Sequence, residues 1–63
     1  MKVYLERTNE SKEIKASNVS ELLKKLSLNP ATVLVIKNNT LVTETEKLNE
    51  KDEIKIISVV SGG

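Results

Sequence analysis

The sequence of 63 residues contains no cysteine and no histidine. Without cysteine the chain can form neither a disulfide nor a thiolate metal site. Without histidine it lacks the commonest metal ligand and the commonest general base. A domain of this length buries only ~60% of the surface that its unfolded chain exposes. We therefore expect one small, marginally stable domain that is not an enzyme and binds no metal.

Aromatic residues and long apolar runs are also scarce. Tyr4 is the only aromatic residue, so the chain has no set of rings on which nucleic-acid bases could stack. The longest apolar run, residues 33–36, is far too short to span a bilayer. Ten basic and nine acidic residues give a net charge of +1, which favours neither nucleic acid nor an anionic membrane as partner. The N-terminus becomes charged too early for the apolar core of a signal peptide, so we expect a cytoplasmic protein.

Glycine is confined to the last two positions, Gly62 and Gly63. Every turn before them must therefore form without glycine. The whole chain is 38% hydrophobic and 30% charged, which is typical of a globular fold and not of a disordered chain. Taken alone, a Gly-Gly end is better explained as a chain terminus without a role.

The first half of the chain predicts two strands and a helix. Apolar and polar residues alternate over 2–7 and again over 12–16, where Ile14 faces inward; the polar cluster 8–11 separates these two strands. A helix over about 19–28 follows from apolar residues spaced i, i+3, i+4 and i+7. Asn18 is expected to cap its start, and Asn29 to take the left-handed position after its end, just before Pro30.

The second half predicts three strands. Residues 32–37 form a β-branched run typical of a central strand. Asn38 and Asn39 indicate a two-residue hairpin turn into a short strand that starts at Leu41. Residues 43–52 predict a polar connecting loop with room for one helical turn, and residues 53–59 alternate as a final strand. The fold class is therefore α+β, with the order β-β-α-β-β-β.

Three stretches of the sequence resemble the ThiS/MoaD-type sulfur carriers, a family of ubiquitin-like β-grasp proteins whose relatives include the archaeal small modifier proteins. They are NVSELLKKLSLNP, TVLVIKNNTLV and LNEKDEIKIISVVSGG. These stretches are similar to the family's capped helix, its strand and turn, and its final strand with a Gly-Gly end. Asn39 and Lys51 stand where the family commonly has glycine, and residues 42–45 lack the arginine and aromatic residue of many ThiS sequences.

The resemblance implies a β-grasp domain at residues 1–59, with a mixed sheet of four to five strands packed on one helix, and a flexible tail at 60–63. It further implies a sulfur carrier. An E1-like adenylating enzyme would use ATP to activate the Gly63 carboxylate. A sulfur donor of the cysteine desulfurase or rhodanese type would then convert it to a thiocarboxylate. A synthase or target protein would accept the sulfur for thiamine, molybdopterin or tRNA thiolation.

Two alternatives to the sulfur carrier stay open. The first is a ubiquitin-like protein modifier that is conjugated through Gly63 to target lysines. The second is a plain interaction domain whose tail has no role. In each case we expect a protein that binds no cofactor and is monomeric when free.

The tail and one face of the sheet are the expected partner-binding surface. Because Gly62 and Gly63 lack a Cβ, the tail can pass through a narrow channel, and Val60 and Ser61 would lead into it. Alternation in the strands turns one apolar set toward the helix: Met1, Val3, Leu5, Val33, Val35, Ile54 and Ile56. It turns a second set away from the helix: Tyr4, Leu34, Ile36, Ile57 and Val59. Apolar surface of this extent is typical of an interface, although central strands also carry such residues for their β-propensity.

Overall fold

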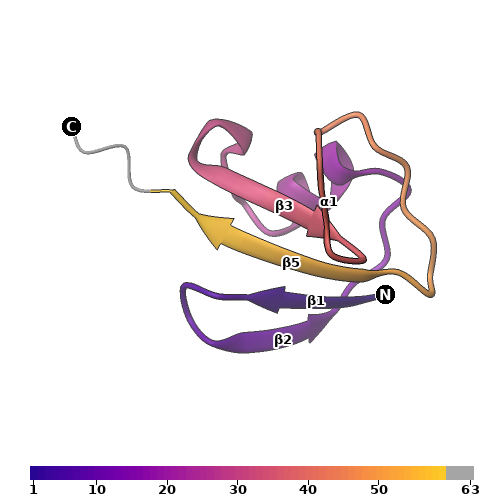
Figure 1. The fold of residues 1–63 in the computed structure, drawn as a ribbon, viewed down its shortest axis with the longest axis horizontal. Coiled ribbons are helices and arrows are strands. Elements are labelled where there is room, and N and C mark those ends of the chain that lie inside the picture. Colours follow the sequence, from indigo (N-terminus) through magenta and orange to yellow (C-terminus); the bar gives the residue numbers. More distant parts are fainter. Residues whose placement is uncertain (60–63) are drawn as a thin grey trace.

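The computed structural model describes residues 1–59, which form a five-stranded mixed sheet and one α-helix (Figure 1). The strand order is β2-β1-β5-β3-β4. The elements are β1 (Lys2–Leu5), β2 (Glu10–Glu13), α1 (Val19–Lys25), a 3₁₀ turn (Pro30–Thr32), β3 (Val33–Lys37), β4 (Thr40–Val42) and β5 (Glu53–Ser58). The first and last strands pair in parallel, and the other neighbours are antiparallel. The α+β class and the predicted strand and helix order are confirmed. The predicted tail, residues 60–63, lies outside the described residues.

The core lies between α1 and one face of the sheet. The helix contributes Val19, Leu22 and Leu23, and Leu48 from the loop before β5 closes one side. All seven residues predicted to face the helix are found there, six of them buried and Leu5 half-buried. Burying one such side chain stabilises the fold by about 1.5–3 kcal/mol, so this small core is the main support of the domain.

The β1–β2 hairpin differs from the prediction by two residues. The turn is Glu6–Asn9, closed by the Asn9 N–H donating to the Glu6 carbonyl at 3.3 Å, with Asn9 at φ 55°. The second strand is therefore Glu10–Glu13, and the predicted strand at 12–16 is wrong. All four residues of β2 are exposed, so no apolar alternation marked this strand, and Ile14 packs against the core just after it ends.

The helix begins as predicted and ends three residues early. The Asn18 side chain accepts a hydrogen bond from the Glu21 N–H at 2.8 Å, which confirms it as the N-cap. At the other end, the N–H of Ser27 donates to Lys24 and that of Leu28 donates to Leu23, the paired pattern of a Schellman motif. Ser27, at φ 58°, holds the left-handed position.

Asn29 therefore does not end the helix, and the prediction for this residue was wrong. Its φ is −86°, and its side chain accepts from the Ala31 N–H, so it caps the 3₁₀ turn that follows. The Asn38–Asn39 turn is confirmed: both residues have positive φ, 49° and 69°, and Lys37 pairs with Thr40 across it. Asparagine and serine thus fill four left-handed positions in which glycine would be usual.

Candidate functional site

The sheet face turned away from α1, called the outer face here, carries an apolar group. In the antiparallel register, Leu34 lies opposite Ile57, and Ile36 lies opposite Leu41. Side chains of alternate residues share a face, so these four residues lie together. Leu34 is 43% exposed and Leu41 62%, whereas Ile36 and Ile57 are half-buried. The structure therefore brings together the predicted residues Leu34, Ile36 and Ile57.

Leu41 belongs to this apolar group but was absent from the predicted set. A two-residue turn at 38–39 fixes the pairing of Lys37 with Thr40 and hence of Ile36 with Leu41. The predicted Asn38–Asn39 turn was therefore enough to place Leu41 beside Ile36 on the outer face.

Tyr4 lies on the same outer face, separated from the apolar group by Lys55. The register places Tyr4 opposite Lys55 on one side and Ile36 opposite Lys55 on the other. The Tyr4 hydroxyl donates to the Asn9 side-chain oxygen at 2.5 Å, which holds the ring along β1 toward the hairpin turn. A shallow groove lined by Tyr4, Ile36 and the Lys55 side chain joins the two parts of the face. The outer face is therefore apolar over β3 and β4, and it carries both polar and apolar side chains over β1.

The described chain ends at one end of the sheet, called the exit end here. Because β1 and β5 are parallel and β3 is antiparallel, the end of β5 lies beside the β1–β2 turn and the start of β3 (Figure 1). Val59 follows β5, is 44% exposed, and donates its N–H to the Thr32 carbonyl at 2.8 Å. The predicted tail residues Val60, Ser61, Gly62 and Gly63 follow from here and lie outside the described residues.

A groove at the exit end, called the exit groove, runs beside the last residues of β5. Its apolar lining comes from Leu28, Val33, Ile57 and Val59, and the β1–β2 turn adds Glu6 and Arg7. The N–H of Glu6 donates to the Ile56 carbonyl at 3.1 Å, which fastens this turn to β5. Within residues 1–59, Arg7 has no ion-pair partner. This groove could not be predicted from the sequence, since its residues come from three separate stretches.

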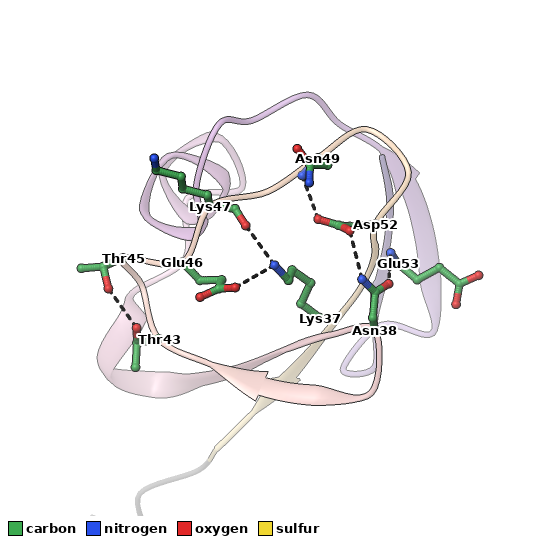
Figure 2. Close-up of polar contacts among 9 residues, drawn as sticks. All are labelled: Lys37, Asn38, Thr43, Thr45, Glu46, Lys47, Asn49, Asp52 and Glu53. Carbon is green, nitrogen blue, oxygen red and sulfur yellow. Dashed lines mark hydrogen bonds and ion pairs between the residues drawn. The ribbon is translucent and has the colours of Figure 1, made fainter.

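The loop between β4 and β5 is held against β3 by polar contacts (Figure 2). Lys37 Nζ donates to Glu46 Oε2 at 2.7 Å and to the Lys47 carbonyl at 3.2 Å. The contact with Glu46 raises the pKa of Lys37 above its ordinary value, because the nearby carboxylate stabilises the charged ammonium. The loop contains turns but no helical turn.

Asp52 and Asn38 join the loop to the β3–β4 turn (Figure 2). The Asp52 carboxylate accepts from the Asn49 N–H at 2.8 Å and from the Asn38 amide at 3.0 Å. The Asn38 side-chain oxygen in turn accepts from the Glu53 N–H at 3.0 Å. The two hydrogen bonds, first that from Asn49, lower the pKa of Asp52, with a smaller contribution from the charge of Lys37. These contacts fix the start of β5, the strand that leads to the exit end.

The same loop supplies acceptors to the start of α1. The N–H of Val19 donates to the Glu46 carbonyl at 3.0 Å, and that of Ser20 to the Glu44 carbonyl at 2.9 Å. These bonds satisfy donors that a helix start leaves free. Three acidic side chains of residues 44–53, those of Glu44, Glu50 and Glu53, are exposed. In this region the backbone carbonyls bond the start of α1, whereas these three acidic side chains point into solvent.

Nothing in residues 1–59 indicates a metal centre or a membrane span. In this part of the chain, no three side chains of His, Cys, Asp or Glu gather as a metal site would require. No helix formed by these residues has the length and apolar character needed to cross a bilayer.

Comparisons with known proteins identify the family of this chain. The sequence model of the ThiS family matches residues 3–63. The chain is 35% identical to the sulfur carrier protein TtuB of Thermus thermophilus over an alignment of 66 residues that covers all of both chains. It is also 39% identical over 51 residues to an uncharacterized protein of Archaeoglobus fulgidus, an alignment that covers 81% of this chain and 75% of the relative. The protein is therefore a member of the ThiS family, with the β-grasp fold of that family.

Proposed function

We propose that this protein is a sulfur carrier and that the Gly63 carboxylate is its reactive group. The observation that carries the proposal is the full-length similarity to a sulfur carrier, together with a family match that runs to residue 63. The protein is then a substrate and a carrier, and the catalysis belongs to its partners.

The first step in this proposal is adenylation by an E1-like enzyme. A Gly63 carboxylate oxygen attacks the α-phosphorus of ATP, the bond from that phosphorus to the bridging oxygen of pyrophosphate breaks, and an acyl adenylate forms. The terminal sulfur of a partner persulfide then attacks the Gly63 carbonyl carbon, and AMP leaves with the bonding electron pair. A thiol cleaves the resulting acyl disulfide, which gives the thiocarboxylate and a disulfide in the partner.

Two features of the described residues fit this role. The last strand pairs with β1 over residues 53–56 and with β3 over residues 54–58, and Val59 is hydrogen-bonded to Thr32, so the tail starts from a fixed point at Val59. With Gly63 as the reacting residue, the tail is residues 60–63, and four extended residues would reach ~13 Å at ~3.3 Å per residue. A partner can therefore hold the folded domain at its surface while the carboxylate enters a buried site.

The outer face is the proposed docking surface for the adenylating enzyme. Leu34, Ile36, Leu41 and Ile57 form a contiguous apolar group beside the strand that ends in the tail. Tyr4 and Val59 extend this surface along β1 and past the end of β5. A few side chains near the centre of a protein interface carry most of its binding free energy, and tyrosine is among the residue types that most often do so.

Intact-mass measurement tests the proposal. The protein is incubated with the E1-like enzyme encoded in the same genome, ATP and a persulfide donor. A mass gain equal to the difference between sulfur and oxygen, absent when Gly63 is deleted, supports the carrier. Higher-mass conjugates that also depend on Gly63 would instead support the lysine modifier. An unchanged mass with an enzyme that is active on another carrier would reject both.

A further inference from the structure

The length of the tail restricts where the activating enzyme can contact this domain. This inference rests on the proposed function. In that proposal Gly63 carries the reacting carbonyl, and a fully extended stretch from Val59 to Gly63 would place it at most ~13 Å from the end of the sheet. The enzyme surface around its tail channel must therefore cover the exit end, whatever part of the outer face it also contacts.

The exit groove is the concave surface at this end, and its lining suits one class of partner segment. Leu28, Ile57 and Val59 contribute apolar lining, and the exposed Arg7 of the β1–β2 turn also lines the groove. Arg7 is the only cation among the residues that line the groove, and it is the only arginine in the chain. Within residues 1–59 its guanidinium forms no ion pair. A carboxylate matches the planar, two-pronged donor set of arginine.

We propose that the exit groove docks an acidic segment of the activating enzyme, with a carboxylate of that segment on Arg7 and an adjacent apolar side chain against Leu28, Ile57 and Val59. Arg7 is then a specificity-determining residue for the choice of enzyme. The nucleotide is a less suitable partner for Arg7, because Arg7 lies beside the start of the tail and the α-phosphorus must lie at its end.

Glu6 provides a matched control because it precedes Arg7 in the same turn and lines the same groove with the opposite charge. Arg7→Gln and Glu6→Gln each remove one charge from an exposed side chain, so both variants should keep the wild-type thermal unfolding curve. If the partner presents a carboxylate, the two changes act differently. Arg7→Gln weakens binding, whereas Glu6→Gln leaves it unchanged or strengthens it.

The test is a calorimetric titration of the full-length protein into the E1-like enzyme without ATP, followed by an adenylation assay on the same samples. We expect Arg7→Gln to raise the Kd about tenfold, the size expected for one charge-assisted contact, and Glu6→Gln not to raise it. In the adenylation assay, Arg7→Gln should raise the KM for the protein and leave kcat and the KM for ATP unchanged.

Several outcomes would overturn the inference. Equal Kd values for Arg7→Gln and the wild type would show that no partner group binds Arg7. Tighter binding by Arg7→Gln would mean that Arg7 instead holds the chain's own terminal carboxylate in the free protein, and a higher KM for ATP would point to the nucleotide. Wild-type binding without adenylation would reject the proposed function alone, and the Kd values of the two variants would then support or reject the inference about the groove. No wild-type binding would reject both.

Discussion

The N–H of Val59 donates to the carbonyl of Thr32 at 2.8 Å, one residue past the end of β5 and one residue before the start of β3. This bond sets the position from which the reach of the tail is measured. The distance from Val59 to the reacting carbonyl then depends on the number of residues between them.

Deleting Ser61 tests whether this distance matters independently of the Gly-Gly end. The variant keeps Gly62 and Gly63 but brings the carboxylate ~3.3 Å closer to the domain. Displacement of a reacting group by about 1 Å can cost ~10²-fold in rate, so we expect kcat/KM for adenylation to fall at least ~10²-fold. Ser61→Ala, which keeps the length, should react at close to the wild-type rate. Equal rates for the two variants would show that the tail length is not critical.

Charged substitutions on the outer face should weaken enzyme binding. Ile36→Glu or Ile57→Glu places a carboxylate in the apolar group, and we expect the Kd of the enzyme complex to rise about tenfold or more. Leu41→Glu should behave similarly, because its side chain is 62% exposed beside Ile36. Each variant should retain the circular dichroism spectrum of the wild type.

Lys51→Glu controls for these variants, since it makes a charge change at an exposed loop residue. It should leave the Kd unchanged. If Lys51→Glu weakens binding as much as Ile36→Glu does, the effect is one of overall charge, and the outer face is not the docking surface.

The Asn38–Asp52 contact predicts how stability depends on pH. The pKa of Asp52 in the folded protein is lowered from its ordinary value of 3.8. The carboxylate therefore contributes stability that is fully present above 3.8 and is lost as the pH falls through the lower folded-state value. Asp52→Asn should reduce the free energy of unfolding near neutral pH and flatten its decline in acid.

Urea unfolding of the wild type and Asp52→Asn, measured from neutral pH to about pH 2, gives the two curves. Glu50→Gln removes a carboxylate from the same loop and controls for the change in net charge. Parallel curves for the wild type and Asp52→Asn would mean that the lowered pKa of Asp52 does not contribute to stability.

The two ends of α1 predict opposite changes in stability. Asn18→Ala removes the side-chain acceptor of the Glu21 N–H and should cost about 1 kcal/mol. Ser27→Gly should stabilise the fold by about 0.5–1 kcal/mol, because Ser27 occupies the left-handed region at φ 58°. Thermal unfolding of both variants checks these values. Ser17→Gly, at a residue without positive φ, is the control; if it stabilises as much as Ser27→Gly, the left-handed position is not the cause.

The sequence predicted elements whose signals are local. Asn18 and the Asn38–Asn39 turn were identified because capping and tight turns depend on adjacent residues. The end of the helix was not, since Leu26 and Leu28 pack against the core and continue the apolar pattern after the backbone has left the helix. The second strand was placed two residues late because its own residues are all polar or charged.

The part of the candidate site that lies within single strands could be predicted from the sequence. Alternation alone assigned Ile36 and Ile57 to the outer face, and the register confirms that position. The exit groove could not be found in this way. Arg7 and Val59 are far apart in the sequence, and only the parallel pairing of β1 with β5 brings their two segments to the same end of the sheet.

That parallel pairing also has a mechanical consequence. The N-terminus enters the sheet at one end of β1, and the chain leaves it from β5 at the opposite end, with the two strands side by side (Figure 1). A force that draws the C-terminus away from the N-terminus therefore acts along both strands. It strains all the hydrogen bonds between β1 and β5 together instead of opening them one after another. A partner that grips the tail can pull on it while the domain resists as one unit.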